Sequence, residues 1–96
     1  MNWNKLYQQI SEIKSKALTE VQNNLPKIEK HPSFDKESGY LPMETMEMLV
    51  DGEMAYVSGI SPKGMLKISG EEPTDIWNLD VYDIVYLGEQ LDMLLK

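Results

Sequence analysis

Residues 43–69 read METMEMLVDGEMAYVSGISPKGMLKIS and contain the clearest signals for secondary structure in the chain. Asp51-Gly52 separates two runs in which apolar and polar residues alternate. This pattern is the strongest short-range signal for a β-hairpin, because a type I′ turn needs two residues at positive φ. Ser61-Pro62-Lys63-Gly64 forms a second turn, in which Pro presets φ and Gly takes the left-handed position. We therefore expect antiparallel strands at 43–50, 53–58 and 65–69.

The predicted sheet has one apolar face. In the third strand Leu66 and Ile68 point one way, while Met65 and Lys67 point the other. Residues 75–79 are a candidate fourth strand. A sheet of this kind must bury its apolar face against another layer.

Two amphipathic helices are available to cover the sheet. In the first, Pro26 disfavours the helical conformation of the residue before it, so we place the helix at 3–23. The second helix is expected at 81–95, with Asp80 as its N-cap. The first helix repeats apolar residues at steps of three and four, at Trp3, Leu6, Tyr7, Ile10, Ile13, Ala17, Leu18 and Val21. The core stripe of the second consists of Ile84, Leu87, Leu91 and Leu94.

Residues 24–42 are expected to form an ordered connector, since they carry apolar groups such as Leu25, Ile28 and Phe34 between their prolines. The 96 residues therefore predict one α+β domain: an N-terminal helix, a three- or four-stranded antiparallel meander and a C-terminal helix. The pattern is compatible with an open sheet and with a small SH3-like curled one.

Charge and composition exclude several classes of function. The net charge of −7 is uneven, because residues 1–40 carry +1 and residues 41–96 carry −8. All nine basic residues are Lys, and Arg is the residue preferred for phosphate and base recognition. We expect no direct binding of nucleic acid and none of anionic membranes. The absence of Cys and of a signal-peptide pattern predicts a cytoplasmic protein without disulfides.

No motif with a known chemistry occurs in the sequence. His31 is the only histidine, and it has no partner at metal-ligand or catalytic spacing. Glu44 and Glu47 fall on opposite faces of a strand, so their carboxylates do not converge. We therefore expect a non-enzymatic protein without cofactor or metal, and keep a small metal-assisted enzyme built on the carboxylates as an alternative.

The C-terminal helix carries a second apolar line. At 100° per residue, Tyr82, Tyr86 and Met93 lie within about 40° of one another, roughly opposite the core stripe, and Glu89 interrupts them. A helix that lies on a sheet does not need such a line, and Tyr and Met are frequent at interfaces. We expect a partner surface here, for another protein or for a second copy in a homodimer.

Two other interpretations of these features stay open. The first helix or the connector could cover the line on the C-terminal helix. The acidic residues could instead imitate nucleic-acid phosphates and inhibit a DNA- or RNA-binding protein.

Overall fold

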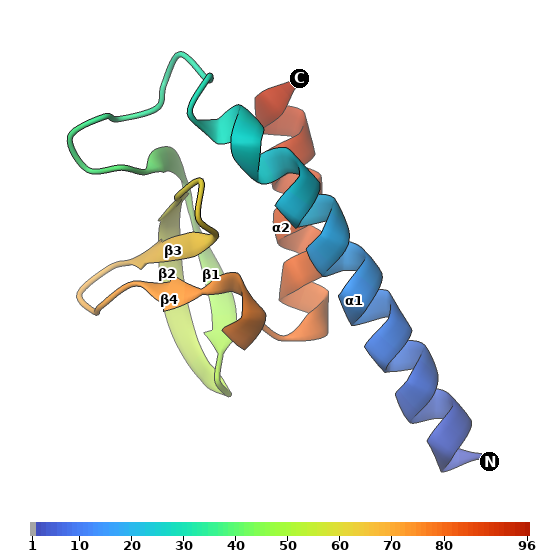
Figure 1. The fold of residues 1–96 in the computed structure, drawn as a ribbon. Coiled ribbons are helices and arrows are strands. Elements are labelled where there is room, and N and C mark those ends of the chain that lie inside the picture. Colours follow the sequence, from blue (N-terminus) through green and yellow to red (C-terminus); the bar gives the residue numbers. More distant parts are fainter. Residues whose placement is uncertain (1) are drawn as a thin grey trace.

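The computed structural model describes residues 2–96 and places an antiparallel sheet beside two helices (Figure 1). Each strand pairs with the next in sequence, in the order β1-β2-β3-β4. This confirms the predicted α+β class with a four-stranded antiparallel sheet. Within the described residues β4 does not pair with β1, although an isolated antiparallel bridge joins Val50 of β1 to Leu79, which follows η1; SH3-like curling is not confirmed. In chain order the elements are α1 (Trp3–Ile28), β1 (Leu41–Val50), β2 (Glu53–Ile60), β3 (Met65–Ile68), β4 (Thr74–Asp75), the 3₁₀ turn η1 (Ile76–Asn78) and α2 (Val81–Leu95).

The hairpin between β1 and β2 has the turn that its sequence predicts. Asp51 and Gly52 both adopt positive φ, at 51° and 81°, as a type I′ turn requires. Val50 pairs with Glu53 across this turn. Gly64 also has positive φ, at 82°, and its backbone approaches the side chains of Ile76 and Leu25 closely.

One core joins the sheet to the second half of α1 and to the inner face of α2. Leu66 and Ile68 point into it, as their alternation predicts. Burying one such aliphatic side chain contributes about 1.5–3 kcal/mol relative to leaving it in water. The fully covered side chains include Val21, Ile28, Leu41, Val57, Ile60, Leu66, Ile84, Leu87 and Leu91.

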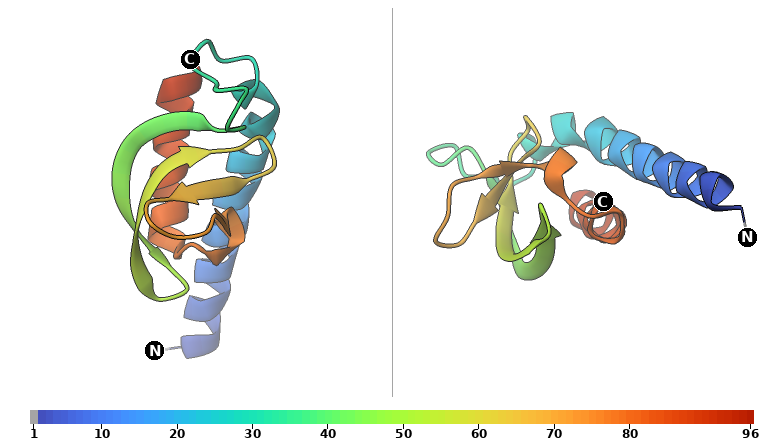
Figure 2. Two further views of the ribbon diagram at one scale, coloured as in Figure 1. Left: turned by 90° about the vertical axis from the view of Figure 1, so that its left-hand side faces the viewer. Right: turned by 90° about the horizontal axis from the view of Figure 1, so that it is seen from below.

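The two helices lie side by side and run in the same direction (Figures 1 and 2). They approach closely at Gly88, where an added Cβ would lie 3.6 Å from Cγ2 of Val21. Farther along, the side-chain amide of Asn24 donates a hydrogen bond of 2.8 Å to the Asp92 carboxylate. The N-terminal part of α1 continues past the beginning of α2 and away from the sheet (Figure 1).

The predicted end of the first helix at residue 23 is wrong, since α1 continues to Ile28 and contains Pro26 in its last turn. Pro26 lacks the N–H that would bond the carbonyl of Gln22. Full burial of Ile28 favours the extra turn and offsets that missing bond. The predicted connector, residues 24–42, is correspondingly shorter.

The strand boundaries also need correction. β1 and β2 are longer than 43–50 and 53–58, because buried Leu41 pairs with Ile60. The expected fourth strand is present but its bounds, 75–79, are wrong: β4 covers only Thr74–Asp75 and a 3₁₀ turn follows. The Asp75 carboxylate accepts the N–H of Trp77 at 2.9 Å, and this cap favours the turn over an extended chain.

Helix α2 begins and ends at the predicted residues, 81 and 95. Asp80 occupies the N-cap position, but its side chain makes no capping hydrogen bond. The carboxylate of Asp83 instead accepts the N–H of Leu49 at 2.7 Å. The backbone N–H of Asp80 donates to the carbonyl of Leu49 at 3.2 Å. These two bonds fix the beginning of α2 to the end of strand β1.

Candidate interaction surface

The line of Tyr82, Tyr86 and Met93 on α2, called here the α2 ridge, faces away from the core. Tyr82 is 80% exposed, Met93 61% and Tyr86 44%. Tyr82 is therefore largely uncovered, and Tyr86 is partly covered and lies across a groove from β1. Glu89, between Tyr86 and Met93, is exposed as well.

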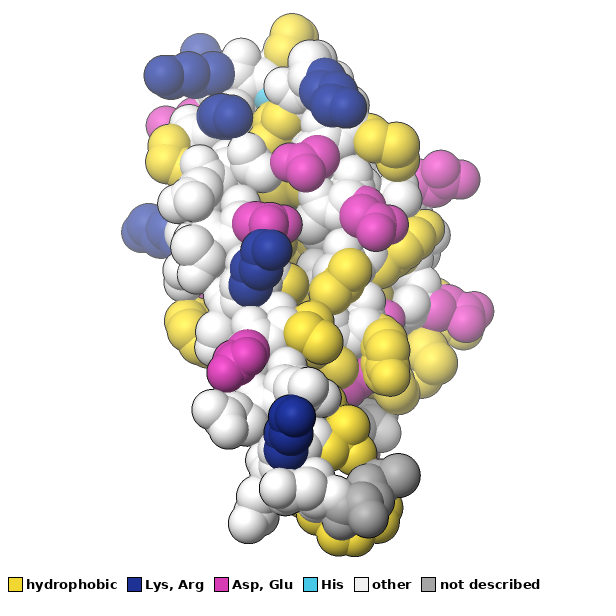
Figure 3. Space-filling model, turned by 90° about the vertical axis from the view of Figure 1, so that its right-hand side faces the viewer, with side chains coloured by type: hydrophobic (Ala, Val, Ile, Leu, Met, Phe, Trp, Pro, Cys, Tyr) yellow, Lys and Arg dark blue, Asp and Glu magenta, His cyan; other side chains and the backbone are white. Residues whose placement is uncertain are grey.

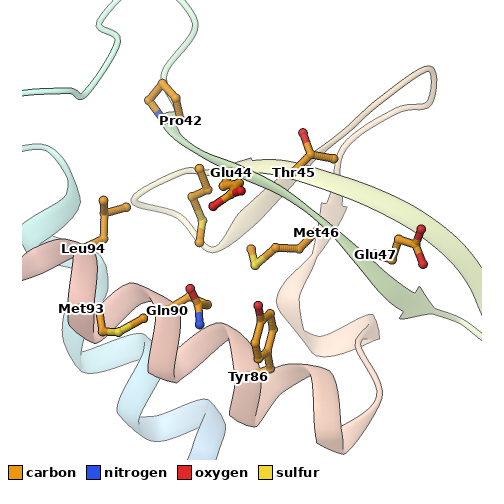
Figure 4. Close-up of a pocket in the computed structure, with 10 residues that line it drawn as sticks. Pro42, Glu44, Thr45, Met46, Glu47, Tyr86, Gln90, Met93 and Leu94 are labelled. Carbon is orange, nitrogen blue, oxygen red and sulfur yellow. The ribbon is translucent and has the colours of Figure 1, made fainter.

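Part of the α2 ridge forms one wall of a groove (Figure 4). Tyr86, Gln90 and Met93 line it from α2, and the opposite wall is strand β1 around Met46, whose side chain points toward the helix (Figure 4). The groove has a volume of about 690 Å³. The register of β1 shifts between Pro42 and Met46 at this place, so an irregular strand segment borders the groove.

A second apolar surface lies on α1. Residues 3–13, called here the α1 overhang, carry five large apolar side chains that are all exposed; Trp3 is 62% exposed and Tyr7 70%. Figure 3 shows apolar side chains gathered along the lower part of the molecule, over this end of α1, and continuing upward beside it. The five are Trp3, Leu6, Tyr7, Ile10 and Ile13.

The sequence interpretation assigned the whole apolar stripe of the first helix to the core, which is wrong for the α1 overhang. Only Ala17, Leu18, Val21 and Ile28 of this helix are buried. Two signals were present in the sequence. From Trp3 to Ala17, apolar residues follow one another at alternating spacings of three and four positions, as in the contact surface between two packed helices. The first helix is also longer than the second, so a common core cannot cover all of it.

A second groove lies where the two helices run side by side. Ile13 from α1 and Val85 from α2 border the same shallow groove, which also contains Gly88. Charged groups of opposite sign flank it, with Lys16 on α1 and Glu89 and Asp92 on α2. This groove connects the end of the α1 overhang at Ile13 with Val85 of α2, whereas Tyr86 and Met93 of the α2 ridge line the other groove, with β1.

Carboxylates gather elsewhere, at the far end of the sheet. Asp51 and Glu53 of the hairpin turn and Glu71 and Glu72 of the next turn line one hollow of about 280 Å³. Within residues 2–96, no group of three or more His, Cys, Asp or Glu side chains is arranged to hold a metal ion. The Nδ1 atom of His31 accepts the N–H of Ser33 at 3.0 Å, which places this histidine in a local turn.

No protein-family model, curated protein or solved structure matches this chain. In the described part of the chain, neither helix combines the length and the apolar character that crossing a membrane requires.

Proposed function

We propose that this protein is a non-enzymatic interaction module that binds a polypeptide through the exposed apolar surfaces of its two helices, the α1 overhang and the α2 ridge. The observation that carries the proposal is the exposure of large apolar side chains along both helices. Contiguous exposed apolar surface on a small protein marks an interaction site more often than chance. Charged side chains at its border, such as Glu89, would orient the partner.

We also propose that the protein is located in the cytoplasm, because the absence of cysteine fits a reducing compartment. The partner is a polypeptide, not nucleic acid or a membrane surface, since the net charge of −7 opposes binding to either polyanion.

The test is a pull-down from the native cell, read by mass spectrometry, with three forms of the protein. Tyr86→Ala, at a side chain that is 44% exposed, shortens the α2 ridge, and Met54→Ala removes an apolar group that is 56% exposed from the sheet. We expect partners captured by the unchanged chain to be retained by Met54→Ala and lost by Tyr86→Ala, with equal melting temperatures for all three. Equal capture by all three forms would contradict the proposal.

A second candidate is an inhibitor whose carboxylates imitate nucleic-acid phosphates. The observation in its favour is the hollow that collects Asp51, Glu53, Glu71 and Glu72 from two turns without a lysine among its lining residues. Binding to a basic nucleic-acid-binding protein would then fall steeply with salt. Glu71→Gln with Glu72→Gln would weaken this binding and leave the function of the α2 ridge unchanged.

A further inference from the structure

Strand β1 lies at one end of the sheet, so β2 uses only one of its two edges. Along an antiparallel strand, residues that bond the neighbouring strand alternate with residues whose N–H and C=O point to the opposite edge. Val50 pairs with Glu53 across the two-residue turn and bonds β2. Leu49 and Glu47, one and three positions before Val50, therefore point to the outer edge.

This outer edge is occupied at Leu49 and free at Glu47. The N–H of Leu49 donates to the Asp83 carboxylate at 2.7 Å, and its C=O accepts the N–H of Asp80 at 3.2 Å. These bonds agree with the alternation and show that the outer edge faces the beginning of α2. Within residues 2–96, no hydrogen bond from a helix, a loop or a side chain reaches the N–H or C=O of Glu47.

The free part of the edge borders the groove between β1 and α2. Met46 and Glu47 line this groove from the strand, and Tyr86 and Met93 line it from the helix. Met46 points toward the helix and Glu47 to the other side of the strand (Figure 4), as the alternation of side chains requires. The volume of about 690 Å³ is within the range of pockets that bind ligands.

We propose that this groove binds an extended peptide, which adds to the outer edge of β1 as a further antiparallel strand between β1 and α2. In this mode of recognition, main-chain hydrogen bonds give affinity, and contacts of alternate side chains give specificity. The inference rests on the proposed function, because it names the conformation and the chemistry of the polypeptide that binds at the α2 ridge.

The unpaired backbone of Glu47 selects an extended chain over a helix. A helix bonds its own N–H and C=O groups internally, except at its ends, so it would cover the α2 ridge and leave the strand edge unpaired. The edge is short, because the register of β1 shifts between Pro42 and Met46 and Pro42 has no N–H. The added segment lies beside residues 43–47 and is therefore about five residues long.

The charge of the groove selects a basic residue in the peptide. Glu44 and Glu47 are among the lining residues, and no lysine is. The peptide residue opposite Glu47 points to the same side as the Glu47 carboxylate, so a Lys or Arg there pairs with it. The two neighbours of this residue point to the other side, toward Met46 and Tyr86, and are apolar. The expected ligand has the pattern apolar, basic, apolar.

The same charges disfavour a second copy of the chain in the groove. Pairing between the outer edges of two β1 strands would bring Glu44 and Glu47 of one copy beside those of the other. Like charges on paired strands are destabilising. A different polypeptide, with a basic residue in an extended segment, is therefore the occupant.

The first test titrates the full chain with the end-blocked synthetic peptide Thr-Val-Lys-Val-Thr and follows the amide signals by NMR. The β-branched residues favour an extended peptide. We expect the Glu47 amide signal to shift and its hydrogen exchange to slow at least about tenfold, because the peptide supplies its missing acceptor. An N-methyl group on the lysine nitrogen removes the bond to the Glu47 carbonyl and should weaken binding about tenfold. An N-methyl group on the first valine, whose nitrogen points away from β1, should leave the affinity unchanged.

The second test reverses the charge at the centre of the contact. Glu47→Lys should bind Thr-Val-Lys-Val-Thr at least about fivefold more weakly, and it should prefer Thr-Val-Glu-Val-Thr. Glu53→Lys makes the same change of net charge at an exposed residue of β2 that does not line the groove. This control should keep the preference for the lysine peptide. Equal melting temperatures of the two variants would show that the fold is intact.

Three outcomes would overturn the inference. A Glu47 amide that neither shifts nor gains protection at several millimolar peptide leaves the edge of β1 without a ligand. Equal weakening by Glu47→Lys and Glu53→Lys shows that net charge alone attracts the peptide. A dimer of the chain that protects the Glu47 amide places a second copy in the groove.

The proposed function has a separate readout. Partners that a pull-down loses with Tyr86→Ala and retains with Glu47→Lys would still support binding at the α2 ridge, although not by strand addition. Failure of the inference and failure of the proposed function are therefore distinguishable.

Discussion

At the scale of single residues, Leu91 and Met93 show how sharply the surroundings change around α2. Leu91 is fully buried and Met93 is 61% exposed. We expect Leu91→Ala to lower the free energy of unfolding by about 2–5 kcal/mol, because it leaves a cavity in the core. Met93→Ala, measured by urea denaturation of the monomer, should change it by no more than about 0.5 kcal/mol. Equal effects of the two substitutions would show that the core and the exposed face of α2 are misassigned.

Asp35 is a second residue with a measurable consequence. The backbone N–H of Glu37 donates to its carboxylate at 2.9 Å, and this bond, supported by the Ser38 hydroxyl, holds the pKa of Asp35 below its usual value. The stability that this turn contributes is present above the usual pKa of an aspartate and is lost as the pH falls through the lowered one. An NMR titration should find the lowered pKa of Asp35, and Ser38→Ala should raise it again. A pKa at the ordinary value would contradict the assigned hydrogen bonds.

At the scale of elements, the contact between α1 and α2 depends on Gly88. A Cβ at this position would lie 3.6 Å from Val21 Cγ2, an ordinary contact distance, and alanine forms helices better than glycine. Gly88→Ala should therefore raise the free energy of unfolding by about 0.5–1 kcal/mol in urea denaturation. Gly88→Leu should lower it, because a larger side chain forces the helices apart. Destabilisation by alanine would mean that the helices pack more closely than described.

The spacing of apolar residues and the turn residues correctly predicted those elements in which local sequence preferences agree with the packing of the folded chain. Asp51-Gly52 specifies its own turn, and the stripe of α2 that contains Ile84 and Leu87 is buried as expected. Prediction failed where contacts between distant parts of the chain determine where an element ends. Burial of Ile28 carries α1 past Pro26, and the Asp75 cap turns a candidate strand into a 3₁₀ helix.

The candidate surface could be predicted only in part. The angular positions of Tyr82, Tyr86 and Met93 opposite the core stripe follow from the helical repeat alone, but the sequence left open whether the first helix or the connector covers them. The groove beside Met46 depends on how far β1 lies from α2, which no local pattern encodes. The exposure of Ile10 depends on where α2 begins along α1, and that too is a tertiary property.

For the whole molecule, a homodimer, one of the two kinds of partner expected for the α2 ridge, would give a melting temperature that depends on protein concentration. For a dimer of this size, each tenfold increase in concentration should raise the melting temperature by about 3 °C. Tyr82→Glu, in the α2 ridge, serves as the control, and its melting temperature should not vary with concentration. A concentration-independent melt of the unchanged chain would argue for a monomer.

The parallel arrangement of α1 and α2 has an electrostatic consequence. Each helix has a macrodipole equivalent to about half a positive charge at its N-terminal end and half a negative charge at its C-terminal end. Because the two helices point the same way, their dipoles add, and the molecule carries a permanent moment along its long dimension.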